Sequence, residues 1–247
     1  MNRFSLDGRT ALVTGANTGI GQAIAVALAE AGARVLCAGR SEPAETLARI
    51  NALGGAAEAV PLDLADPLAG GRVFEGLPPV DILVNNAGTI LRADAVDFTE
   101  EDWDAVIDVN LKAAFFTAQG FARAAFARDA GGAIINVASL LSFQGGIRVP
   151  SYTASKHGIA GLTKLLACEW AGRGINVNAI APGYVVTNNT KDLRADPVRN
   201  KAILDRIPAG RWAEPDDIAG AAVFLASPAA AYMHGAIIPV DGGWLAR

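Results

Sequence analysis

The sequence is poor in the residues that mark several classes of protein. Two cysteines in 247 residues are too few for a disulfide framework, and His157 and His234 lack the spacing of metal ligands, so we expect no metal site. Charged residues make up only 19% of the chain, the net charge is −4, and lysine and arginine form no run, which argues against a nucleic-acid partner. No apolar stretch approaches the roughly 18 residues that span a bilayer, and the opening MNRFSLDGRT lacks a signal-peptide pattern. We therefore expect a cytoplasmic protein with no membrane partner.

Apolar residues, in contrast, are abundant, at 51% of the chain, which is enough for a large core. Seven short β-rich runs alternate with longer helical stretches. The runs are Thr10–Thr14, Arg34–Ala38, Ala56–Leu62, Val80–Val84, Ala133–Ala138, Asn176–Ala181 and Ile237–Val240. Continuous apolar strands joined by helices predict the α/β class, here a single Rossmann-type domain over residues 1–247 with a doubly wound parallel sheet and helices on both faces.

The helical stretches leave one irregular segment. Helices are predicted over Glu101–Arg128, Ser151–Gly172, Val198–Ile207 and Pro215–Ser227. Residues 182–210 begin with a polar, aperiodic stretch that we expect to form a substrate lid at the carboxyl edge of the sheet, a plain surface loop being the alternative. Cys37 falls in a strand and Cys168 in a helix, and both are expected to be small buried hydrophobic residues.

A glycine-rich turn, Thr14-Gly15-Ala16-Asn17-Thr18-Gly19-Ile20-Gly21, follows the first strand and opens a helix. Gly15 permits the tight turn, Gly19 allows the backbone to approach a pyrophosphate, and Gly21 allows the helix to pack closely on the strand. The amino end of the helix offers free N–H groups and the positive end of its dipole to phosphates. The pattern predicts a dinucleotide site, the alternative being a tight turn without a ligand.

The end of the second strand bears on the choice of dinucleotide. Cys37-Ala38-Gly39-Arg40-Ser41 offers no carboxylate to the ribose 2′-hydroxyl, whereas Arg40 can pair with a 2′-phosphate. NADP is thereby favoured over NAD, unless Arg40 is a solvated charge in a turn. Asp63, after the third strand, is placed either to bond an adenine amino group or to cap the next helix.

Tyr152 and Lys156 are spaced so that they share a helix face, about one turn or roughly 6 Å apart along the axis. A tyrosine titrates near pH 10, and a positive charge about 5 Å away would lower its pKa by roughly two units at an effective dielectric constant of about 20. The pair can therefore supply a general acid–base. A solvated helix face is the ordinary alternative for this spacing.

Taken together, these segments resemble the short-chain dehydrogenase/reductase family over essentially the whole chain. The matching features are TGANTGIG, Asp63, Asn85-Asn86-Ala87-Gly88, Asn110, Ser139, the Tyr152/Lys156 pair, and Pro182-Gly183 with Thr187. Four further segments resemble the sugar-acid dehydrogenases within the family: SFQGGIRVPSYTASKHGIAGLTK, APGYVVTNNT, ILDRIPAGRW and VDGGWLAR.

The resemblance implies roles for four residues. Tyr152 would exchange a proton with the substrate oxygen, and Lys156 would lower the pKa of Tyr152 and bond the nicotinamide ribose. Ser139 would donate a hydrogen bond to the same substrate oxygen and stabilise charge there. Asn110 would hold a water that joins Lys156 to solvent. Taken singly, Ser139 is an ordinary strand-end residue and Asn110 an ordinary polar helix residue.

The resemblance also implies the cofactor contacts. Besides Tyr152 and Lys156 they are Gly15, Asn17, Thr18, Gly19, Ile20, Gly21, Arg40, Ser41, Asp63, Leu64, Asn86, Ala87, Gly88, Pro182, Gly183, Val185 and Thr187. Many NADP-preferring members carry a basic residue where this chain has Asn17 and Thr18, and the sugar-acid dehydrogenases often use NAD. Both nicotinamides are therefore retained, with NADP slightly favoured.

The predicted function is an NAD(P)-dependent oxidoreductase acting on a sugar acid of the gluconate, 2-deoxygluconate or 2-dehydro-3-deoxygluconate type. Candidate substrate residues are Gln144, Arg148, Asn188, Asn189 and Arg211. Arg148 is favoured because it lies four residues before Tyr152 and its planar fork matches a carboxylate, a surface ion pair being the alternative. The competing functions are a ketoacyl-type or other carbonyl reductase and a non-catalytic dinucleotide sensor.

The resemblance and the long helices rich in alanine and leucine imply a homotetramer, the alternative being that these helices only cover the sheet. The apolar tail, Trp244-Leu245-Ala246-Arg247, is expected to lie in a subunit interface.

Overall fold

A seven-stranded parallel sheet organises the computed structural model, which describes residues 2–247. The strands are β1 (Thr10–Thr14), β2 (Arg34–Gly39), β3 (Ala57–Pro61), β4 (Ile82–Asn85), β5 (Gly132–Val137), β6 (Ile175–Pro182) and β7 (Ile237–Val240). Their order is β3-β2-β1-β4-β5-β6-β7, and every neighbouring pair is parallel. The predicted single-domain, doubly wound α/β fold is confirmed, and each strand begins and ends within two residues of its predicted bounds.

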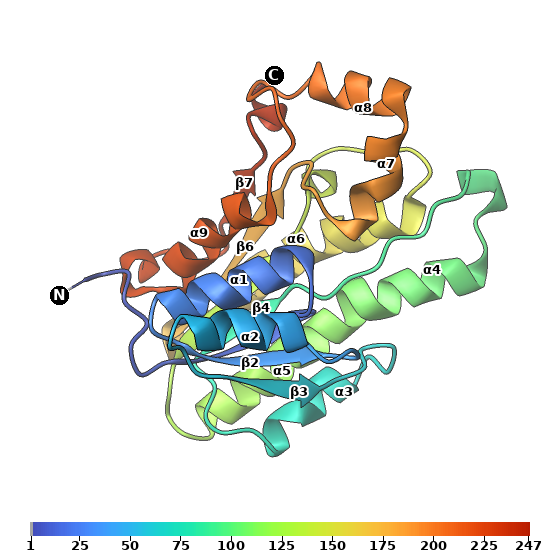
Figure 1. Cartoon of the computed structure of the whole chain (residues 1–247). Helices are drawn as coiled ribbons and strands as arrows, with labels where there is room; N and C mark the ends of the chain where they lie inside the picture. The colour runs from blue at the N-terminus through green and yellow to red at the C-terminus, as the bar shows by residue number, and fades with distance from the viewer. Residues whose placement is uncertain (1) are drawn as a thin grey trace.

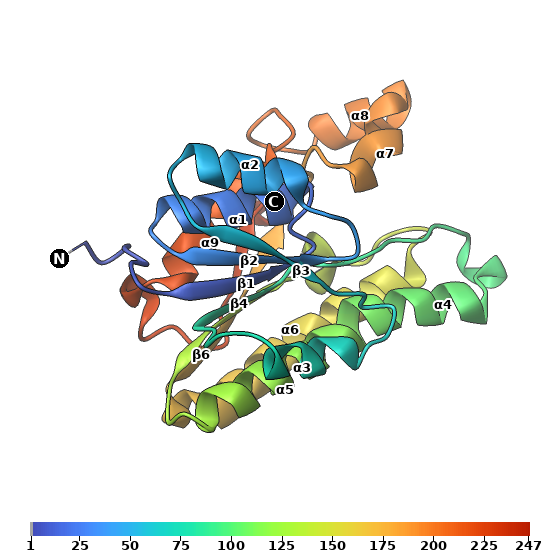
Figure 2. The same cartoon turned by 60° about the horizontal axis from the view of Figure 1, so that its bottom comes forward.

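Helices cover both faces of the sheet (Figures 1 and 2). One face carries α1 (Gly19–Glu30), α2 (Ala44–Ala52) and α9 (Pro215–Ala226), and the other carries α3 (Ala69–Arg72), α4 (Glu100–Ile107), α5 (Ala113–Phe126) and α6 (Pro150–Trp170). Successive strand residues enter opposite cores: Val13 packs in the cluster that includes α1 and α9, and Leu12 in the cluster that includes α5 and α6. This arrangement explains why the strands are apolar at consecutive positions.

The predicted helix Glu101–Arg128 is interrupted in the structure. A π-helical turn over Asp108–Lys112 separates α4 from α5. Such a turn inserts an extra residue into the helical repeat. It leaves Asn110 buried, with its side chain bonded to the backbone of Thr89 in the loop that follows β4.

Two short helices, α7 (Lys191–Ala195) and α8 (Pro197–Leu204), project beyond the carboxyl edge of the sheet (Figure 1). Asp196 caps α8 by accepting hydrogen bonds from the backbone N–H groups of Val198 and Arg199, and Pro197 occupies the first turn. The predicted irregular segment thus contains α7. The helix predicted over Val198–Ile207 corresponds to α8, which ends earlier, at Leu204. The function of this region as a lid stays a prediction.

The C-terminal tail packs against its own chain. Trp244 is 4% exposed, its ring centroid lies 4.7 Å from that of Tyr184, and its indole N–H donates to Gln144 Oε1 at 3.1 Å. The Arg206 guanidinium stacks 4.0 Å from the same ring. Trp244 is therefore buried within its own chain, and the subunit interface expected for the tail stays a prediction.

The two cysteines differ in environment. Cys37 is buried in β2, as predicted, but Cys168 is exposed, so its predicted burial is wrong. Leu166 and Ala167, which precede Cys168 on α6, face the core, and the helical repeat carries the next residue to the outer surface.

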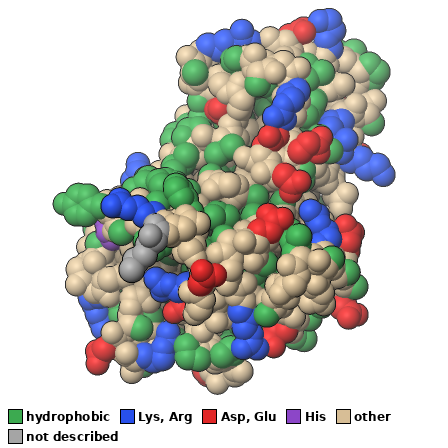
Figure 3. Space-filling model, turned by 60° about the vertical axis from the view of Figure 1, so that its left-hand side comes forward, with side chains coloured by type: hydrophobic (Ala, Val, Ile, Leu, Met, Phe, Trp, Pro, Cys, Tyr) green, Lys and Arg blue, Asp and Glu red, His purple; other side chains and the backbone are tan. Residues whose placement is uncertain are grey.

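The surface mixes charges of both signs. Figure 3 shows the face around the amino terminus, where acidic and basic side chains alternate with hydrophobic ones. Across residues 2–247, no helix combines the length and the apolar character required to cross a membrane.

Candidate active site

A cleft of about 690 Å³ opens at the carboxyl ends of β1, β2 and β4, where the strand order reverses. In open α/β sheets, ligands bind at this switch point. The cleft brings together most of the predicted cofactor residues: Gly15, Asn17, Thr18, Gly19, Ile20, Gly21, Arg40, Ser41, Asp63, Leu64, Asn86, Ala87, Gly88, Tyr152, Lys156 and Thr187.

The glycine turn depends on close approach of the backbone. Gly19 has φ of +57°, and a Cβ atom on Gly21 would overlap the carbonyl oxygen of Gly15 and the side-chain amide of Asn86. Thr18, which precedes α1, makes no capping bond to it through its side chain among the described residues. The first N–H groups of α1 are thus left to bind an anion in the cleft.

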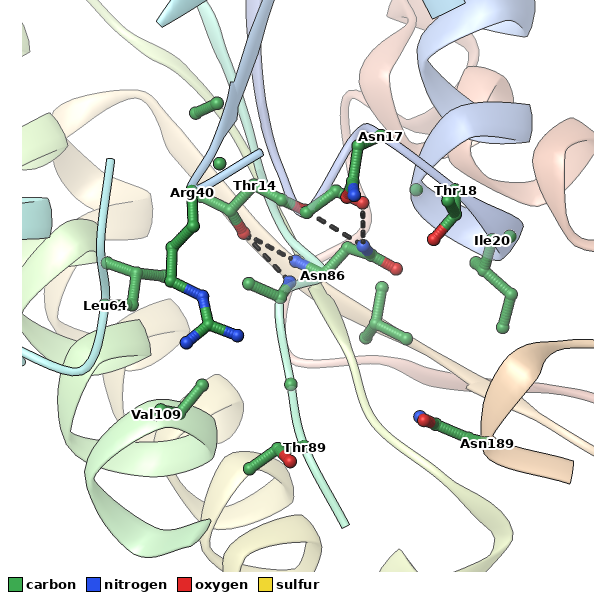
Figure 4. Close-up of a pocket in the computed structure, with 18 of the residues that line it drawn as sticks. Thr14, Asn17, Thr18, Ile20, Arg40, Leu64, Asn86, Thr89, Val109 and Asn189 are labelled. Atoms are coloured by element: carbon green, nitrogen blue, oxygen red, sulfur yellow. Dashed lines mark hydrogen bonds between the residues drawn. The ribbon is translucent and has the colours of Figure 1, made fainter. Parts of the chain in front are cut away.

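Asn86 ties this turn to the loop that follows β4 (Figure 4). Its side-chain N–H group donates to the carbonyl oxygens of Thr14 at 2.9 Å and Gly15 at 3.2 Å. The Thr14 hydroxyl oxygen accepts, at 3.0 Å each, from the backbone N–H groups of Asn86 and Ala87. Asn86 and Ala87 therefore both line the cleft and stabilise the junction of β1 and β4.

Arg40 extends into the cleft from the end of β2 (Figure 4). Its Nε lies 4.0 Å from Asp63 Oδ1, and both side chains are more than half exposed. A long, solvated pair of this kind is weak. The guanidinium group of Arg40 is therefore available to a bound anion.

Tyr152 and Lys156 lie on one face of α6, with Lys156 Nζ 5.5 Å from the Tyr152 ring centroid. Lys156 Nζ donates to the Val137 carbonyl oxygen at 2.7 Å, and burial lowers the pKa of this ammonium to about 8. Burial raises the pKa of the Tyr152 phenol, opposed by a hydrogen bond with Ser139 and by the positive charge of Arg92. The expectation that Lys156 lowers the pKa of Tyr152 is therefore wrong here, because Nζ is directed at Val137 and desolvation of the phenol dominates.

Ser139 is held at the end of β5 by a reciprocal cap. Its hydroxyl accepts from the backbone N–H of Leu141 at 3.2 Å, and its own N–H donates to Ser142 Oγ at 3.3 Å. The Ser142 hydroxyl in turn donates to the Lys156 carbonyl oxygen at 2.7 Å. Ser142 thus joins Ser139 to α6, a positioning role that the sequence did not reveal.

Asn110 binds the loop after β4 with its side-chain amide. Oδ1 accepts from the Thr89 backbone N–H at 2.8 Å, and Nδ2 donates to the Thr89 carbonyl at 2.9 Å and to Ser155 Oγ at 3.4 Å. The π turn therefore fixes this loop against α6. The water relay expected of Asn110 stays a prediction.

Several predicted site residues lie elsewhere. Pro182, Gly183 and Val185 lie at the end of β6 outside the cleft lining, and Val185 is buried in a bridge with Ala213. Of the substrate candidates, Asn188 and Asn189 line the cleft, but three do not. Gln144 bonds Trp244, Arg148 Nε lies 3.1 Å from Asp94, and Arg211 forms two bonds to Asp217 at 2.6 and 2.8 Å.

Sequence analysis missed Arg92. Its Nη2 donates to the Asn189 carbonyl oxygen at 2.9 Å, and its positive charge lowers the pKa of Tyr152. The available signal was its place in the loop that follows Asn85-Asn86-Ala87-Gly88, at the carboxyl edge where ligands bind. Thr46 was also missed; its hydroxyl donates to the Ala16 carbonyl at 2.7 Å and supports the glycine turn from α2.

The strand order defines a dinucleotide-binding fold, and one cleft is lined by the glycine turn, Tyr152 and Lys156, with Ser139 hydrogen-bonded to Tyr152. The chain belongs to the short-chain dehydrogenase/reductase family. A family model described as Enoyl-(Acyl carrier protein) reductase matches residues 15–245.

Individual relatives cover essentially the full chain. The 2-dehydro-3-deoxy-D-gluconate 5-dehydrogenase of Dickeya dadantii is 54% identical over 251 residues, covering 100% of this chain and 99% of the relative. A crystal structure from Agrobacterium tumefaciens, provisionally assigned as a 2-deoxy-D-gluconate 3-dehydrogenase with bound NADP, is 68% identical with a TM-score of 0.98 and full coverage of both chains. A gluconate 5-dehydrogenase from Burkholderia cenocepacia in complex with NADP and tartrate is 38% identical with a TM-score of 0.94, covering 100% of this chain and 98% of that one. This chain is accordingly an oxidoreductase that acts on a CH–OH group.

The buried ammonium predicts a pH-dependent effect on stability. Below pH 8 Lys156 is charged in both the folded and unfolded states, and the folded state carries the full desolvation penalty; between pH 8 and 10.5 the folded state loses its proton first and the penalty shrinks. Lys156→Met removes the penalty, worth about 3 kcal/mol at most, and loses the bond to Val137, worth about 1 kcal/mol. We expect urea unfolding to show a gain of about 2 kcal/mol at pH 7 that declines toward pH 10. A gain of the same size at both pH values would contradict the shifted pKa of Lys156.

Proposed function

We propose that this protein uses NADP to interconvert the alcohol and ketone forms of a sugar acid of the gluconate or deoxygluconate type. The observation that carries the proposal is that Tyr152 and Lys156 line one cleft with the glycine turn, and that Ser139 is hydrogen-bonded to Tyr152. The printed names of the Dickeya and Agrobacterium relatives support the substrate class, as does tartrate, a hydroxy acid, in the Burkholderia complex. A cytoplasmic location is part of the proposal, because nicotinamide cofactors and sugar acids are metabolites of that compartment.

The residues of the cleft fit NADP. The crowded glycine turn and the amino end of α1 would hold the pyrophosphate, and Asp63 and Leu64 would flank the adenine. Arg40 would bind the 2′-phosphate. Lys156 would bond the nicotinamide ribose, and Thr187 its carboxamide or a phosphate. When bound, the nicotinamide supplies or accepts the hydride.

The protein's own groups manage the proton. In the oxidation direction, Tyr152 Oη accepts the proton of the substrate hydroxyl while hydride leaves the carbon that bears this hydroxyl; in reduction Tyr152 returns a proton to the carbonyl oxygen. Ser139 donates a hydrogen bond to the same oxygen and stabilises the charge that develops there. The lowered pKa of Lys156, about 8, suits an ammonium that passes protons onward near neutrality.

We also propose that residues 182–210 form a substrate lid. Asn188 and Asn189, which precede α7, line the cleft, and α7 and α8 lie beyond them at the carboxyl edge of the sheet. Ile203 of α8 packs in an apolar cluster with Ile207 and Trp244, and Leu193 of α7 packs against this cluster.

Replacing the phenol tests the chemistry directly. Tyr152→Phe should lower turnover by about 10³-fold, because it removes the proton donor and acceptor, while NADPH binding is retained. Absorbance of the reduced nicotinamide is followed with 5-dehydro-D-gluconate, and an acyl thioester is the comparison substrate. Wild-type activity on the thioester alone would favour the ketoacyl reductase, and cofactor binding without turnover of any ketone would favour the sensor.

Arg40 should set the preference between nicotinamides. Arg40→Ala is expected to weaken NADPH binding by about 10- to 100-fold, the range for one charge-assisted hydrogen bond, and to leave NADH binding nearly unchanged. Arg72→Ala is the matched control, because Arg72 pairs with Asp66 outside the cleft lining. Titration of protein fluorescence measures both affinities. Equal losses for the two cofactors would exclude recognition of the 2′-phosphate by Arg40.

A homotetramer completes the proposal. β7 ends the sheet with Ile237, Ile238 and Val240 only half-buried, and Phe4 and Tyr232 are exposed large hydrophobic residues. Exposed apolar surface of this kind favours association. Size-exclusion chromatography with light scattering should give about 100 kDa, four times the chain mass of 25.4 kDa. A monomer of 25.4 kDa at micromolar concentration would be the contrary result.

A further inference from the structure

The C-terminal tail reaches the segment that carries Ser139. Trp244 belongs to one apolar cluster with Leu140, the residue that follows Ser139, and the two side chains are 4% and 5% exposed. The indole N–H of Trp244 donates at 3.1 Å to Oε1 of Gln144, which lies further along the same segment. Trp244 therefore supports residues 139–144 both by packing and by a hydrogen bond.

The bond to Gln144 falls where this segment loses other support. The Ser142 hydroxyl ties the middle of the segment to the backbone of α6. Gly145 follows Gln144, and a Cβ atom placed on Gly145 would meet no other atom within 4 Å. A glycine in open space restricts the backbone little. The indole of Trp244 therefore anchors residues 139–144 just before the chain enters this open stretch.

Trp244 is itself held firmly enough to act as a support. The Asp241 carboxylate accepts hydrogen bonds, at 2.9 Å each, from the backbone N–H groups of Gly243 and Leu245, on either side of Trp244. The Arg206 guanidinium lies 4.0 Å from the ring centroid, and its Nη2 is 3.5 Å from the same side-chain oxygen that the indole bonds. These contacts fix the turn and the ring together.

The position of Ser139 matters to the chemistry. Ser139 is hydrogen-bonded to Tyr152, and this bond lowers the pKa of the phenol against the effect of burial. A group that contacts a reacting atom must be held within about 0.5 Å of its productive position. A misplacement of about 1 Å can cost about 10²-fold in rate. A contact that supports residues 139–144 therefore bears on catalysis.

We propose that Trp244 is a positioning residue, which acts through Leu140 and Gln144 to hold Ser139 against the reacting oxygen of the substrate. This inference rests on the proposed function, in which Ser139 donates a hydrogen bond to that oxygen. Trp244 does not line the cleft, so its replacement leaves the contacts with substrate and cofactor in place. The effect of Trp244 on the reaction therefore exists only while Ser139 is present.

A double-mutant cycle tests this dependence. Stopped-flow absorbance of NADPH with saturating 5-dehydro-D-gluconate measures the rate of the chemical step. Ser139→Ala should lower this rate by about 10²- to 10³-fold, the range for one donor to a developing oxyanion. Trp244→Phe, which keeps an aromatic ring but loses the indole N–H, should lower it by about 3- to 10-fold, the equivalent of one hydrogen bond. In the Ser139→Ala background, Trp244→Phe should change the rate by less than about 1.5-fold.

The partner of the indole provides a rescue. Gln144→Met removes the acceptor and should reproduce the loss seen in Trp244→Phe, whereas Gln144→Glu keeps an acceptor and should retain most of the rate. Trp170→Phe is the matched control, because Trp170 packs against Phe126 at the end of α6 that lies far from Tyr152. Its rate should equal that of the wild type.

The pH dependence is a readout that a loss of stability alone would not move. Ser139→Ala should shift the pH dependence assigned to Tyr152 to higher pH, because a bond that lowers the phenol's pKa is lost, and Trp244→Phe should give a smaller shift in the same direction. Arg92 and Lys156, the charged groups near the phenol, are unchanged in both variants. Affinity for NADPH and the mass from light scattering should match the wild type, which shows that Trp244→Phe is folded and assembled.

The outcomes separate this inference from the proposed function. An unchanged rate in Trp244→Phe, a loss of the same size with and without Ser139, or a lowered mass overturns the positioning role and leaves the proposed function standing. A raised KM without a lower rate in Gln144→Met makes Gln144 a substrate contact and also overturns it. A wild type that reduces no ketone with either nicotinamide refutes the proposed function, and the inference is refuted with it.

Discussion

Hydrogen bonds between Thr14 and Asn86 join two walls of the cleft, the end of β1 and the loop that follows β4. β1 and β4 are neighbours in the sheet, but the chain leaves their carboxyl ends in opposite directions, toward α1 and toward the loop that carries Thr89 and Arg92. Reciprocal bonds between the Thr14 hydroxyl, the Asn86 amide and the intervening backbone fix the glycine turn relative to that loop. Because residues of both the turn and the loop line the cleft, this junction sets the distance between two of its walls.

Burial of the catalytic pair opposes stability and serves the chemistry. An ammonium with a pKa of about 8 is costly to bury, and it is retained where an amine that titrates near neutrality is useful. The phenol is different, because burial raises its pKa and no single neighbour reverses this. The groups that lower its pKa come from separate segments: Ser139 at the end of β5 and Arg92 after β4.

The sequence predicted what depends on local pattern and missed what depends on distant partners. Continuous apolar runs located all seven strands, because a strand covered on both faces must be apolar throughout. The helical repeat continues through Asp108–Lys112, so it concealed the π turn that buries Asn110. Arg148 was favoured for its spacing from Tyr152, yet its partner, Asp94, comes from another loop. Arg92 was overlooked because Asn189 lies 97 residues away in the chain.

Because the net charge is −4, the binding of an anionic ligand depends on where individual arginines lie. A chain with a net negative charge repels anionic ligands weakly at long range, and salt screens this effect beyond about 8 Å. Affinity for an anion must therefore come from the cations and N–H groups that touch it. Arg40 has only a long, solvated contact with Asp63, so it keeps most of its capacity to bind a ligand. Arg40 therefore gives the cleft a guanidinium group that is free to contact a phosphorylated ligand.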